Sequence, residues 1–421
     1  MILRIDCYLE RPQPRHLAKA ISFTSVCNAS GSSMQLENYY SPKQWQKIQN
    51  FAANKPSPFL LVDLDRVEFK YQELQQSFPQ ANIFYAVKAN PSIEILQRLD
   101  RMGSCFDIAS VYELDRVIDC GISPERISFG NTIKKASDVK YAYDKGIRLF
   151  VTDAQADLEQ IAKYAPNSKV FVRVLVESGS TSDWPLSRKF GCDTQMAIDL
   201  MVKAQQMGLQ PYGVSFHVGS QQNDVTVWRT ALKTAKVVFE TLEKEHGIQL
   251  ELINAGGGFP AQYLADIDSI QDYAKRIQCY IDDLFQQKVT LFLEPGRSLV
   301  GDAGVIVSEI VLISNKSEQD EKRWIYTDVG VFNGLIETLG EMIKYPIYTP
   351  KMHNNSSKSN VVLAGPTCDS TDIMYEKIAY PLPQDLAMGD RLYWLSTGAY
   401  TTSYASVEFN GYPPLKTFYL D

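Results

Sequence analysis

The chain has 421 residues, of which 45% are hydrophobic and 11% aromatic, and its formal net charge at pH 7 is −7. A chain of this length and composition can bury a large core, and we expect two domains. The acidic balance, without a long basic run, argues against nucleic acid as a partner. No apolar run approaches the roughly 20 residues of a membrane-spanning helix, so we also expect no membrane association.

The seven cysteines are scattered along the chain, with neither a Cys-x-x-Cys pair nor the ligand spacing of a metal site. An odd number of cysteines without a framework is typical of reduced thiols, which predicts a cytoplasmic protein that holds no metal. Residues 1–34 carry basic residues and a Ser/Asn-rich stretch but lack the hydrophobic core of a signal peptide. We expect this segment to be a flexible N-terminal extension.

From residue 84 onward, short β-prone runs alternate with stretches of helical apolar spacing. The clearest helix follows a capping box of Ser110 and Glu113, and Gly121 suits its end. The β-prone runs cover residues 84–87, 105–109, 127–129, 148–152, 169–175, 212–218, 250–255 and 290–294. Eight strand–helix units predict an α/β fold with a (β/α)8 barrel, which we place at residues 61–297. A doubly wound sheet is the structural rival, although nothing in it would limit the count to eight.

The pattern changes after Gly296, where β-prone runs follow one another without long helices between them. This change predicts a C-terminal β-sandwich or β-barrel domain over residues 298–421. We expect residues 35–60, which precede the barrel, to join this β domain.

Lys88 directly follows an apolar, β-prone run. The carboxyl ends of barrel strands carry the active sites of barrel enzymes, so an amine at this place is suited to chemistry. A lysine with a depressed pKa can form a Schiff base with an aldehyde cofactor. The alternative is an ordinary solvated lysine in a loop.

Two loops suited to phosphate follow the seventh and eighth predicted strands. The first contains the triplet Gly256-Gly257-Gly258, and the second contains Arg297. Glycines let backbone N–H groups approach a phosphate closely, and arginine binds it in a fork. These are the two places where barrel enzymes commonly bind phosphate, although a glycine triplet by itself is usually only a turn.

His217 and Glu294 end the sixth and eighth predicted strands. His217 is either a satisfied core histidine or an imidazole lying against an aromatic ring. Glu294 either pairs with Arg297 or faces a pyridine nitrogen, which it would keep protonated. A lysine, a phosphate site, a histidine and a carboxylate on one rim point to pyridoxal 5'-phosphate as the cofactor.

The chain also resembles the fold type III amino-acid decarboxylases from about residue 35 to its C-terminus. Six motifs carry the resemblance: Tyr85-Ala86-Val87-Lys88-Ala89-Asn90, Phe106-Asp107-Ile108-Ala109-Ser110, His217-Val218-Gly219-Ser220-Gln221, Gly256-Gly257-Gly258-Phe259-Pro260, Glu294-Pro295-Gly296-Arg297 and Gly365-Pro366-Thr367-Cys368-Asp369-Ser370.

The resemblance assigns a role to residues throughout the predicted barrel rim. It implies that Lys88 binds the cofactor covalently, that His217 stacks on its ring, and that Glu294 pairs with its pyridine nitrogen. Asp107 and Arg173 match positions that support the lysine and ring side of the pocket. The residues implied to hold the phosphate are Gly257, Gly258, Arg297, Ser220 and Tyr400.

Three further matches concern the substrate. Cys368 matches the residue that returns a proton after carbon dioxide leaves, and Asp369 the residue that binds the substrate's distal amine. Phe409 matches a residue lining the substrate pocket. In this family Cys368 and Asp369 would come from the second subunit, which implies a homodimer with shared active sites. The alternative for Cys368 is a buried, inert thiol.

The motif around Cys368 bears on the substrate, because diaminopimelate decarboxylases carry Glu where Asp369 stands here. The stretch 328–345 resembles the bacterial-type ornithine and lysine/ornithine branch. Eukaryotic-type ornithine enzymes place a Tyr-Asp pair where Glu337 and Thr338 stand, so the role of Glu337 stays open between amine binding and solvent. We favour L-ornithine, giving putrescine and carbon dioxide in polyamine biosynthesis. Lysine or dual lysine/ornithine decarboxylation, giving cadaverine, is the alternative.

Other classes of function also fit parts of the sequence. A non-catalytic, regulator-binding homologue would have no chemical need for Lys88 or Cys368. A single-domain cofactor carrier would not need the β domain. An amino-acid racemase shares the barrel but is expected to place something other than a carboxylate at the pyridine nitrogen.

Overall fold

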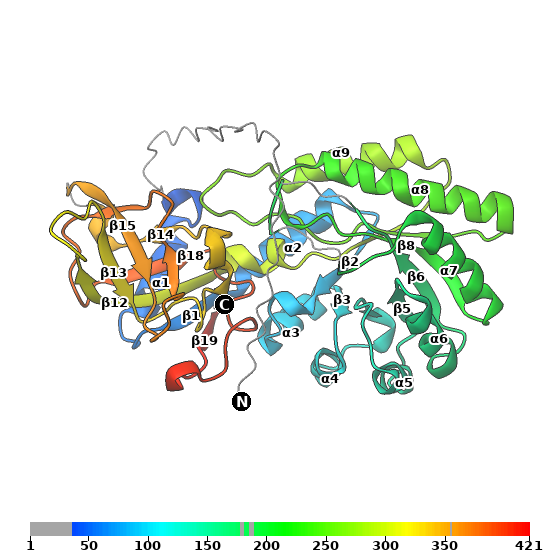
Figure 1. Ribbon diagram of the computed structural model, residues 1–421, viewed down its shortest axis with the longest axis horizontal. Coiled ribbons are helices and arrows are strands. Elements are labelled where there is room, and N and C mark those ends of the chain that lie inside the picture. Colours follow the sequence, from blue (N-terminus) through cyan, green and yellow to red (C-terminus); the bar gives the residue numbers. More distant parts are fainter. Residues whose placement is uncertain (1–35, 177–180, 185–188, 354–355) are drawn as a thin grey trace, which may run out of the picture. The chain divides into compact units, whose positions relative to one another are not determined.

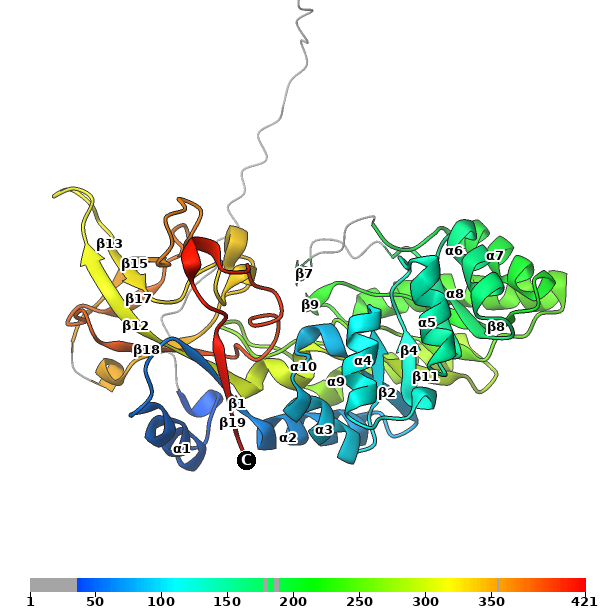
Figure 2. The ribbon, with the colours of Figure 1, turned by 90° about the horizontal axis from the view of Figure 1, so that it is seen from below.

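The computed structural model describes residues 36–176, 181–184, 189–353 and 356–421. The N-terminal extension expected at residues 1–34 lies outside the described residues. The remainder forms one compact unit from Leu36 to Asp421. Within that unit, Figures 1 and 2 show a part rich in strands beside a barrel surrounded by helices.

The barrel consists of eight parallel strands that close on themselves. In chain order they are β2 (Ala81–Ala86), β3 (Cys105–Ile108), β4 (Ile127–Phe129), β5 (Leu149–Thr152), β6 (Lys169–Arg173), β8 (Gln210–Ser215), β10 (Leu252–Asn254) and β11 (Thr290–Leu293). Each overlaps one of the eight runs expected from the sequence, so the predicted (β/α)8 barrel is confirmed and the doubly wound sheet is wrong.

Helices cover the outside of the barrel (Figure 1). They are α2 (Leu64–Ser77), α3 (Ile93–Arg101), α4 (Val111–Asp119), α5 (Ala136–Asp144), α6 (Gln155–Tyr164), α7 (Thr194–Gln206), α8 (Thr226–His246) and α9 (Ile270–Leu284). Helix α4 begins as predicted, with the Ser110 hydroxyl accepting from the Glu113 N–H at 3.2 Å. The Glu113 carboxylate accepts from the Ala109 N–H at 2.7 Å instead of from Ser110, so the capping box is displaced by one residue.

The interior of the barrel contains an apolar layer of five buried side chains from five strands. They are Phe84, Val151, Phe171, Leu252 and Phe292. Side chains two positions apart on a strand point to the same face. The residues two positions further along β2, β6, β10 and β11 therefore form the next layer toward the carboxyl ends, and they are Ala86, Arg173, Asn254 and Glu294.

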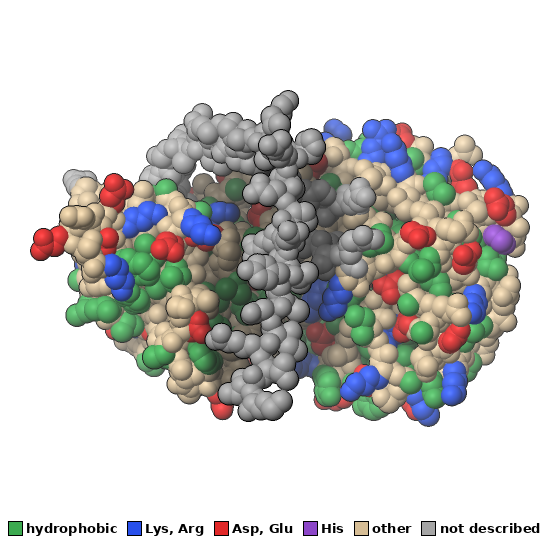
Figure 3. Space-filling model, in the orientation of Figure 1, with side chains coloured by type: hydrophobic (Ala, Val, Ile, Leu, Met, Phe, Trp, Pro, Cys, Tyr) green, Lys and Arg blue, Asp and Glu red, His purple; other side chains and the backbone are tan. Residues whose placement is uncertain are grey.

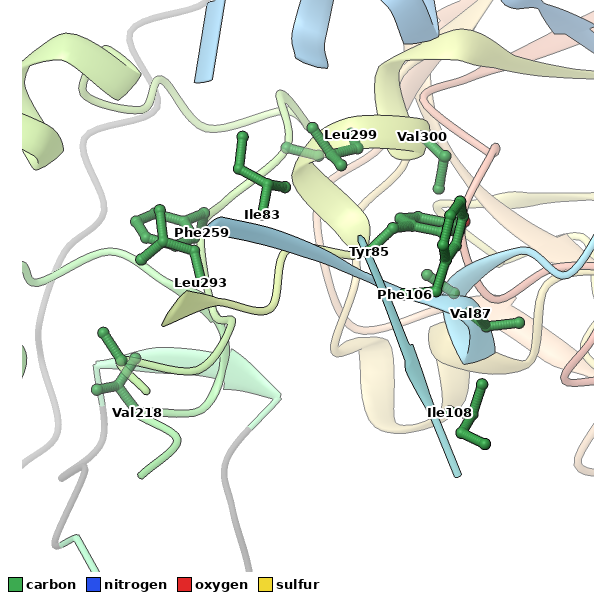
Figure 4. Packing of buried hydrophobic residues seen from close by; sticks show 14 of the residues in the cluster. Ile83, Tyr85, Val87, Phe106, Ile108, Val218, Phe259, Leu293, Leu299 and Val300 are labelled. Carbon is green, nitrogen blue, oxygen red and sulfur yellow. The ribbon is translucent and has the colours of Figure 1, made fainter. Parts of the chain in front are cut away.

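The alternate residues of the same strands pack outward. Figure 4 shows Ile83 and Tyr85 of β2 in the main apolar cluster, with Val87 just after that strand and Phe106 and Ile108 of β3. Tyr85 and Phe106 are fully buried. The period-two alternation thus separates the residues that hold the helices from those that face the barrel axis.

The strand-rich part is built on a mixed sheet of nine strands. Its central strand β12 (Gly304–Ser314) pairs with β1 (Phe59–Asp63), β13 (Arg323–Thr327) and β18 (Arg391–Leu395). The other strands are β14 (Ile347–Tyr348), β15 (Lys358–Ala364), β16 (Ile373–Tyr375), β17 (Pro381–Pro383) and β19 (Lys416–Leu420). The predicted β-rich part after the barrel is confirmed.

The segment before the barrel contacts this sheet. In α1 (Pro42–Ala52) the ring of Trp45 lies 4.8 Å from Tyr348 and 5.2 Å from Tyr393. The strand β1 spans residue 61, where the barrel was expected to begin, and pairs within the nine-stranded sheet. The chain therefore leaves this sheet only at α2.

The described surface carries charges of both signs. On the face shown in Figure 3, acidic and basic side chains are interspersed over the visible described residues. None of the described helices has the length and apolar character needed to cross a membrane.

Trp394 of β18 is fully buried, and its indole N–H donates to the Ser308 hydroxyl at 2.9 Å. We expect Trp394→Ala to lower the free energy of unfolding by about 3–5 kcal/mol, because it leaves a cavity and removes the hydrogen bond that the Ser308 hydroxyl accepts. Urea denaturation measures this change. The control is Trp324→Ala in β13, a half-buried tryptophan stacked on Tyr326, for which we expect a smaller loss. Equal losses at both positions would contradict the packing described.

Candidate active site

A cavity of about 290 Å³ lies at the carboxyl ends of the barrel strands. Its lining comprises Lys88, Asp107, Ala109, Gly130, Asn131, Arg173, Phe190, His217, Ser220, Arg297, Glu337, Tyr400 and Tyr404. A narrower pocket shares five of these residues and adds, among others, Gly257, Gly258 and Glu294. The structure thus brings together all of the residues that the sequence analysis assigned to cofactor binding.

Lys88 lies in a short 3-10 turn, Val87–Ala89, that follows β2. Contacts with the strand-rich part hold this turn in place. The Asn90 amide donates to the Gly398 carbonyl at 2.9 Å, and the Tyr400 N–H donates to the Ala89 carbonyl at 2.8 Å. The Lys88 amine is therefore positioned by both parts of the chain.

The groups around Lys88 shift the pKa of its amine. Desolvation acts to lower the pKa of Lys88, but the surroundings outweigh it, with Tyr400 and Asp107 as the largest contributions. The pKa of Lys88 is consequently raised above its ordinary value.

Asp107 raises the pKa of Lys88, whereas Arg173 lowers it. Asp107 is 7% exposed, and its Oδ1 atom is buried without a hydrogen-bond partner. Burial, together with Glu294, raises the pKa of Asp107 well above its ordinary value, against the opposing effect of Lys88. Burial lowers the pKa of Arg173, whose guanidinium lies 4.8 Å from the centre of the Phe190 ring.

His217 is held by its own backbone turn. The Gly219 N–H donates to the imidazole Nδ1 at 3.0 Å, which leaves Nε2 as the protonated nitrogen of the neutral ring. Burial lowers the pKa of His217 well below 6.5, and Arg173 and Lys88 add to the effect. The ring is therefore neutral near pH 7, and it lines both cavities beside Lys88.

Glu294 does not pair with Arg297, which was one of the two sequence alternatives. Its Oε1 atom instead accepts from the Asn254 amide at 2.5 Å. The other end of that amide accepts from the Gly256 N–H at 3.0 Å. Asn254 thus ties the carboxylate to the glycine loop, and the sequence analysis did not identify this residue.

The glycine loop has no room for side chains at its centre. A Cβ atom on Gly257 would lie 2.5 Å from the Glu294 carbonyl oxygen, and one on Gly258 would lie 2.5 Å from the Gly219 carbonyl oxygen. Gly258 also has a φ of +99°, which disfavours any other residue. This close-packed backbone, with Ser220, Arg297 and Tyr400 at the same pocket, fits the phosphate of pyridoxal 5'-phosphate.

Arg297 has a partner that the sequence left unassigned. Its guanidinium forms two contacts of 2.7 Å with the two carboxylate oxygens of Glu337, and both side chains are 3% exposed. Glu337 therefore does not point to solvent. The Arg297 Nε–H donates to the Ser220 hydroxyl at 3.0 Å, and an Nη1–H donates to the Tyr263 hydroxyl at 2.7 Å.

Three residues assigned to the substrate do not line these cavities. Cys368 is exposed, so the alternative of a buried inert thiol is wrong. Asp369 accepts hydrogen bonds from the Thr371 N–H and hydroxyl, which lower the pKa of Asp369. Phe409 packs against Phe332, with 5.0 Å between ring centres. The single chain therefore brings together the residues assigned to the cofactor, without those assigned to the substrate.

Several cavity residues were missed. Tyr404 and Phe190 line the larger cavity, and Tyr263 contacts Arg297. Nothing in their local sequence distinguishes them from ordinary aromatic residues, because only the folded loops bring them to the rim. Among the described residues, no group of three or more His, Cys, Asp or Glu side chains could hold a metal ion.

The neutral state of His217 predicts a pH dependence of stability. Below pH 6.5 the unfolded chain binds a proton on this imidazole that the folded chain excludes, so stability falls as pH falls. The contribution amounts to at most about 1.4 kcal/mol per pH unit. We expect His217→Gln to reduce the loss of unfolding free energy between pH 7.5 and 5.5, as measured by urea denaturation. His246→Gln, at the exposed end of α8, is the control and should retain the wild-type dependence.

Comparison with known proteins shows the family to which this architecture belongs. The family model described as "Pyridoxal-dependent decarboxylase, pyridoxal binding domain" matches residues 64–301. The lysine/ornithine decarboxylase of Selenomonas ruminantium is 32% identical, over 87% of this chain and 90% of that protein. The ornithine decarboxylase of Caenorhabditis elegans is 33% identical, over 88% of this chain and 91% of that protein.

One relative bears a different kind of name. The antizyme inhibitor 2 of Xenopus laevis is 31% identical, over 84% of this chain and 79% of that protein.

Among solved structures, the lysine/ornithine decarboxylase of Vibrio vulnificus complexed with cadaverine has a TM-score of 0.81 and 28% identity, and the match covers 90% of this chain and 99% of that one. The structure of SrLDC in complex with PLP and cadaverine has a TM-score of 0.80 and 30% identity, and the match covers 90% of this chain and 94% of that one. The chain therefore belongs to the family of pyridoxal-dependent decarboxylases.

Proposed function

We propose that this protein removes the carboxyl group of a basic amino acid, most effectively L-ornithine, to give putrescine and carbon dioxide. The observation that carries the proposal is the convergence of Lys88, the Gly257–Gly258 backbone and Glu294 on one pocket. The names of the S. ruminantium and C. elegans relatives support a basic substrate. Lysine is longer than ornithine by one methylene, which a pocket distinguishes by only about 1–3 kcal/mol, so we expect it to be the second substrate.

The barrel residues would hold the cofactor at both ends. Lys88 would bind it covalently, and the backbone of Gly257 and Gly258, with Ser220, Arg297 and Tyr400, would bind its phosphate. When bound, pyridoxal 5'-phosphate supplies an electron-withdrawing ring that stabilises the negative charge left by the departing carboxyl group. These assignments follow the cavity lining and the six family motifs.

The remaining residues would set the electrostatics of the ring. Glu294, oriented by the Asn254 amide, would hold a proton at the pyridine nitrogen. The neutral imidazole of His217 would pack against the ring without adding a positive charge. Arg173 belongs to the same barrel layer, Asp107 pairs with Ala86 of that layer, and both would support the lysine side of the pocket.

The substrate side requires a second subunit. Cys368 of the partner subunit would donate a proton to the carbon that has lost its carboxyl group, because a thiol is a competent acid near neutral pH. Asp369 of the partner subunit would bind the distal amine, and Phe409 would line the substrate pocket. The exposure of Cys368 and its absence from the cavity of its own chain support this assignment. A reduced thiol suits a cytoplasmic enzyme.

The first test measures carbon dioxide release by the purified protein with pyridoxal 5'-phosphate and equal concentrations of L-ornithine, L-lysine, L-arginine and meso-diaminopimelate. We expect the highest rate with ornithine and a lower rate with lysine. Lys88→Ala should abolish turnover and the visible absorption band of the covalently held cofactor, because the amine is lost. The control Lys145→Ala alters a lysine away from both cavities. Silence with all four amino acids would favour a non-catalytic, regulator-binding protein.

Mixing two inactive variants tests the shared site. If Lys88 and Cys368 come from different subunits, then Lys88→Ala and Cys368→Ala subunits should each have low activity and regain it together. Random reassociation of a symmetric dimer would restore about a quarter of wild-type activity, because half of the dimers then carry one intact site. Carbon dioxide release after mixing, with size-exclusion chromatography of each variant, measures this recovery. The absence of any recovery from well-mixed dimers would contradict the shared site.

A further inference from the structure

The carboxylate of Glu337 forms an ion pair with Arg297, the arginine that is assigned to the cofactor phosphate. Glu337 is 2% exposed, and its two oxygens lie 2.7 Å from two different nitrogens of Arg297. This is the bidentate geometry in which an arginine–carboxylate pair is strongest and most directional. No family motif in the sequence assigns a role to Glu337.

Counting donors shows how little of Arg297 stays available. A guanidinium has five N–H groups. One is donated to Ser220, one to Tyr263 and two to Glu337. A single N–H is left, on the Nη2 atom, so Arg297 cannot present an open fork to a phosphate while this pair is intact.

The position of Glu337 is itself determined by the strand-rich part. It lies in the 3-10 segment Ile336–Glu341, where the neighbouring Thr338 is fully buried. The Ile343 N–H donates to the Glu337 carbonyl at 3.0 Å, and the Thr338 hydroxyl donates to the Leu335 carbonyl at 2.6 Å. The ring of Tyr400 lies 4.9 Å from the Arg297 guanidinium on another side. Arg297 is therefore enclosed by groups that are fixed before any ligand binds.

The pair is also nearly neutral and inaccessible to water. A buried ion pair is costly to break from one side, because the remaining charge is left without compensation. If Glu337 moved to bind a substrate amine, the guanidinium of Arg297 would be left buried without a compensating charge. The larger cavity has only one other carboxylate in its described lining, Asp107, which belongs to the lysine side.

We propose that Glu337 is a positioning residue for the phosphate site: it fixes Arg297 so that Ser220 and the remaining N–H face the Gly257–Gly258 loop, and it does not bind the distal amine of the substrate. The inference rests on the proposed function in taking the phosphate of pyridoxal 5'-phosphate as the ligand. It extends that function, because it leaves the distal amine to Asp369 of the partner subunit and assigns cofactor affinity to a residue outside the barrel.

The test compares two probes, pyridoxal 5'-phosphate and pyridoxal, which differ only in the phosphate. Equilibrium dialysis of the dimer gives a Kd for each. We expect Glu337→Gln to raise the Kd for pyridoxal 5'-phosphate by about tenfold or more, the range for partners that orient a ligand-binding group, and to leave that for pyridoxal unchanged. Glu318→Gln, in an exposed loop, is the matched control and should change neither.

A double variant and the substrate KM separate the two roles. Adding Glu337→Gln to Arg297→Gln should weaken cofactor binding no further, since Glu337 acts through Arg297. With saturating cofactor, the KM for ornithine of Glu337→Gln should equal that of the wild type. An unchanged or tighter binding of pyridoxal 5'-phosphate by Glu337→Gln, or a selective rise in KM, would overturn the inference.

Two controls keep these results interpretable. Pyridoxal binding reports on the integrity of the pocket in the same variant. General destabilisation would raise the Kd for both probes equally, and that result would count against a specific effect on the phosphate. A wild-type protein that binds neither probe would refute the proposed function. A wild-type protein that binds both, with a Glu337→Gln variant that is indistinguishable from it, would refute the inference alone.

Discussion

The site depends on the strict alternation of side chains along the barrel strands. Phe84, Phe171, Leu252 and Phe292 fill the interior, which fixes the register of their strands. A shift by one residue would turn these side chains toward the helices. The apolar layer therefore determines which residues face the barrel axis in the next layer toward the carboxyl ends. Those residues, two positions further on, include Arg173, Asn254 and Glu294. Packing of the interior and placement of the site are therefore one constraint.

The rim of the barrel is completed by the strand-rich part. Hydrogen bonds from Asn90 to Gly398 and from Tyr400 to Ala89 hold the turn that carries Lys88. On the other side of the pocket, Glu337 holds Arg297. The amine and the arginine that are assigned to the cofactor are thus both oriented from the strand-rich part, by Gly398 at 308 positions from Asn90 and by Glu337 at 40 positions from Arg297. A barrel without this second part would leave the turn of Lys88 without these hydrogen bonds and Arg297 without Glu337.

The sequence predicted which residues meet at the rim of the barrel, because they lie at strand ends whose order in the chain is their order around the barrel. Lys88, Asp107, Arg173 and His217 could be placed from periodicity and motifs. Asn254 could not, because an asparagine at a strand end gives no sign of the carboxylate that it contacts. The direction of the pKa shift of Lys88 could not be predicted either, because it depends on the summed effect of burial, Tyr400 and the nearby carboxylates.

The sequence by itself determined the eight-strand count, the apolar strand interiors and the chemical types available at the rim, since these depend on local periodicity and composition. Only the tertiary structure decided how the charges pair. Glu294 contacts Asn254, and Arg297 contacts Glu337, because pairing among buried charges depends on which side chains converge in space and on how completely each donor is satisfied. Such convergence joins residues distant in the chain, and no local pattern encodes it.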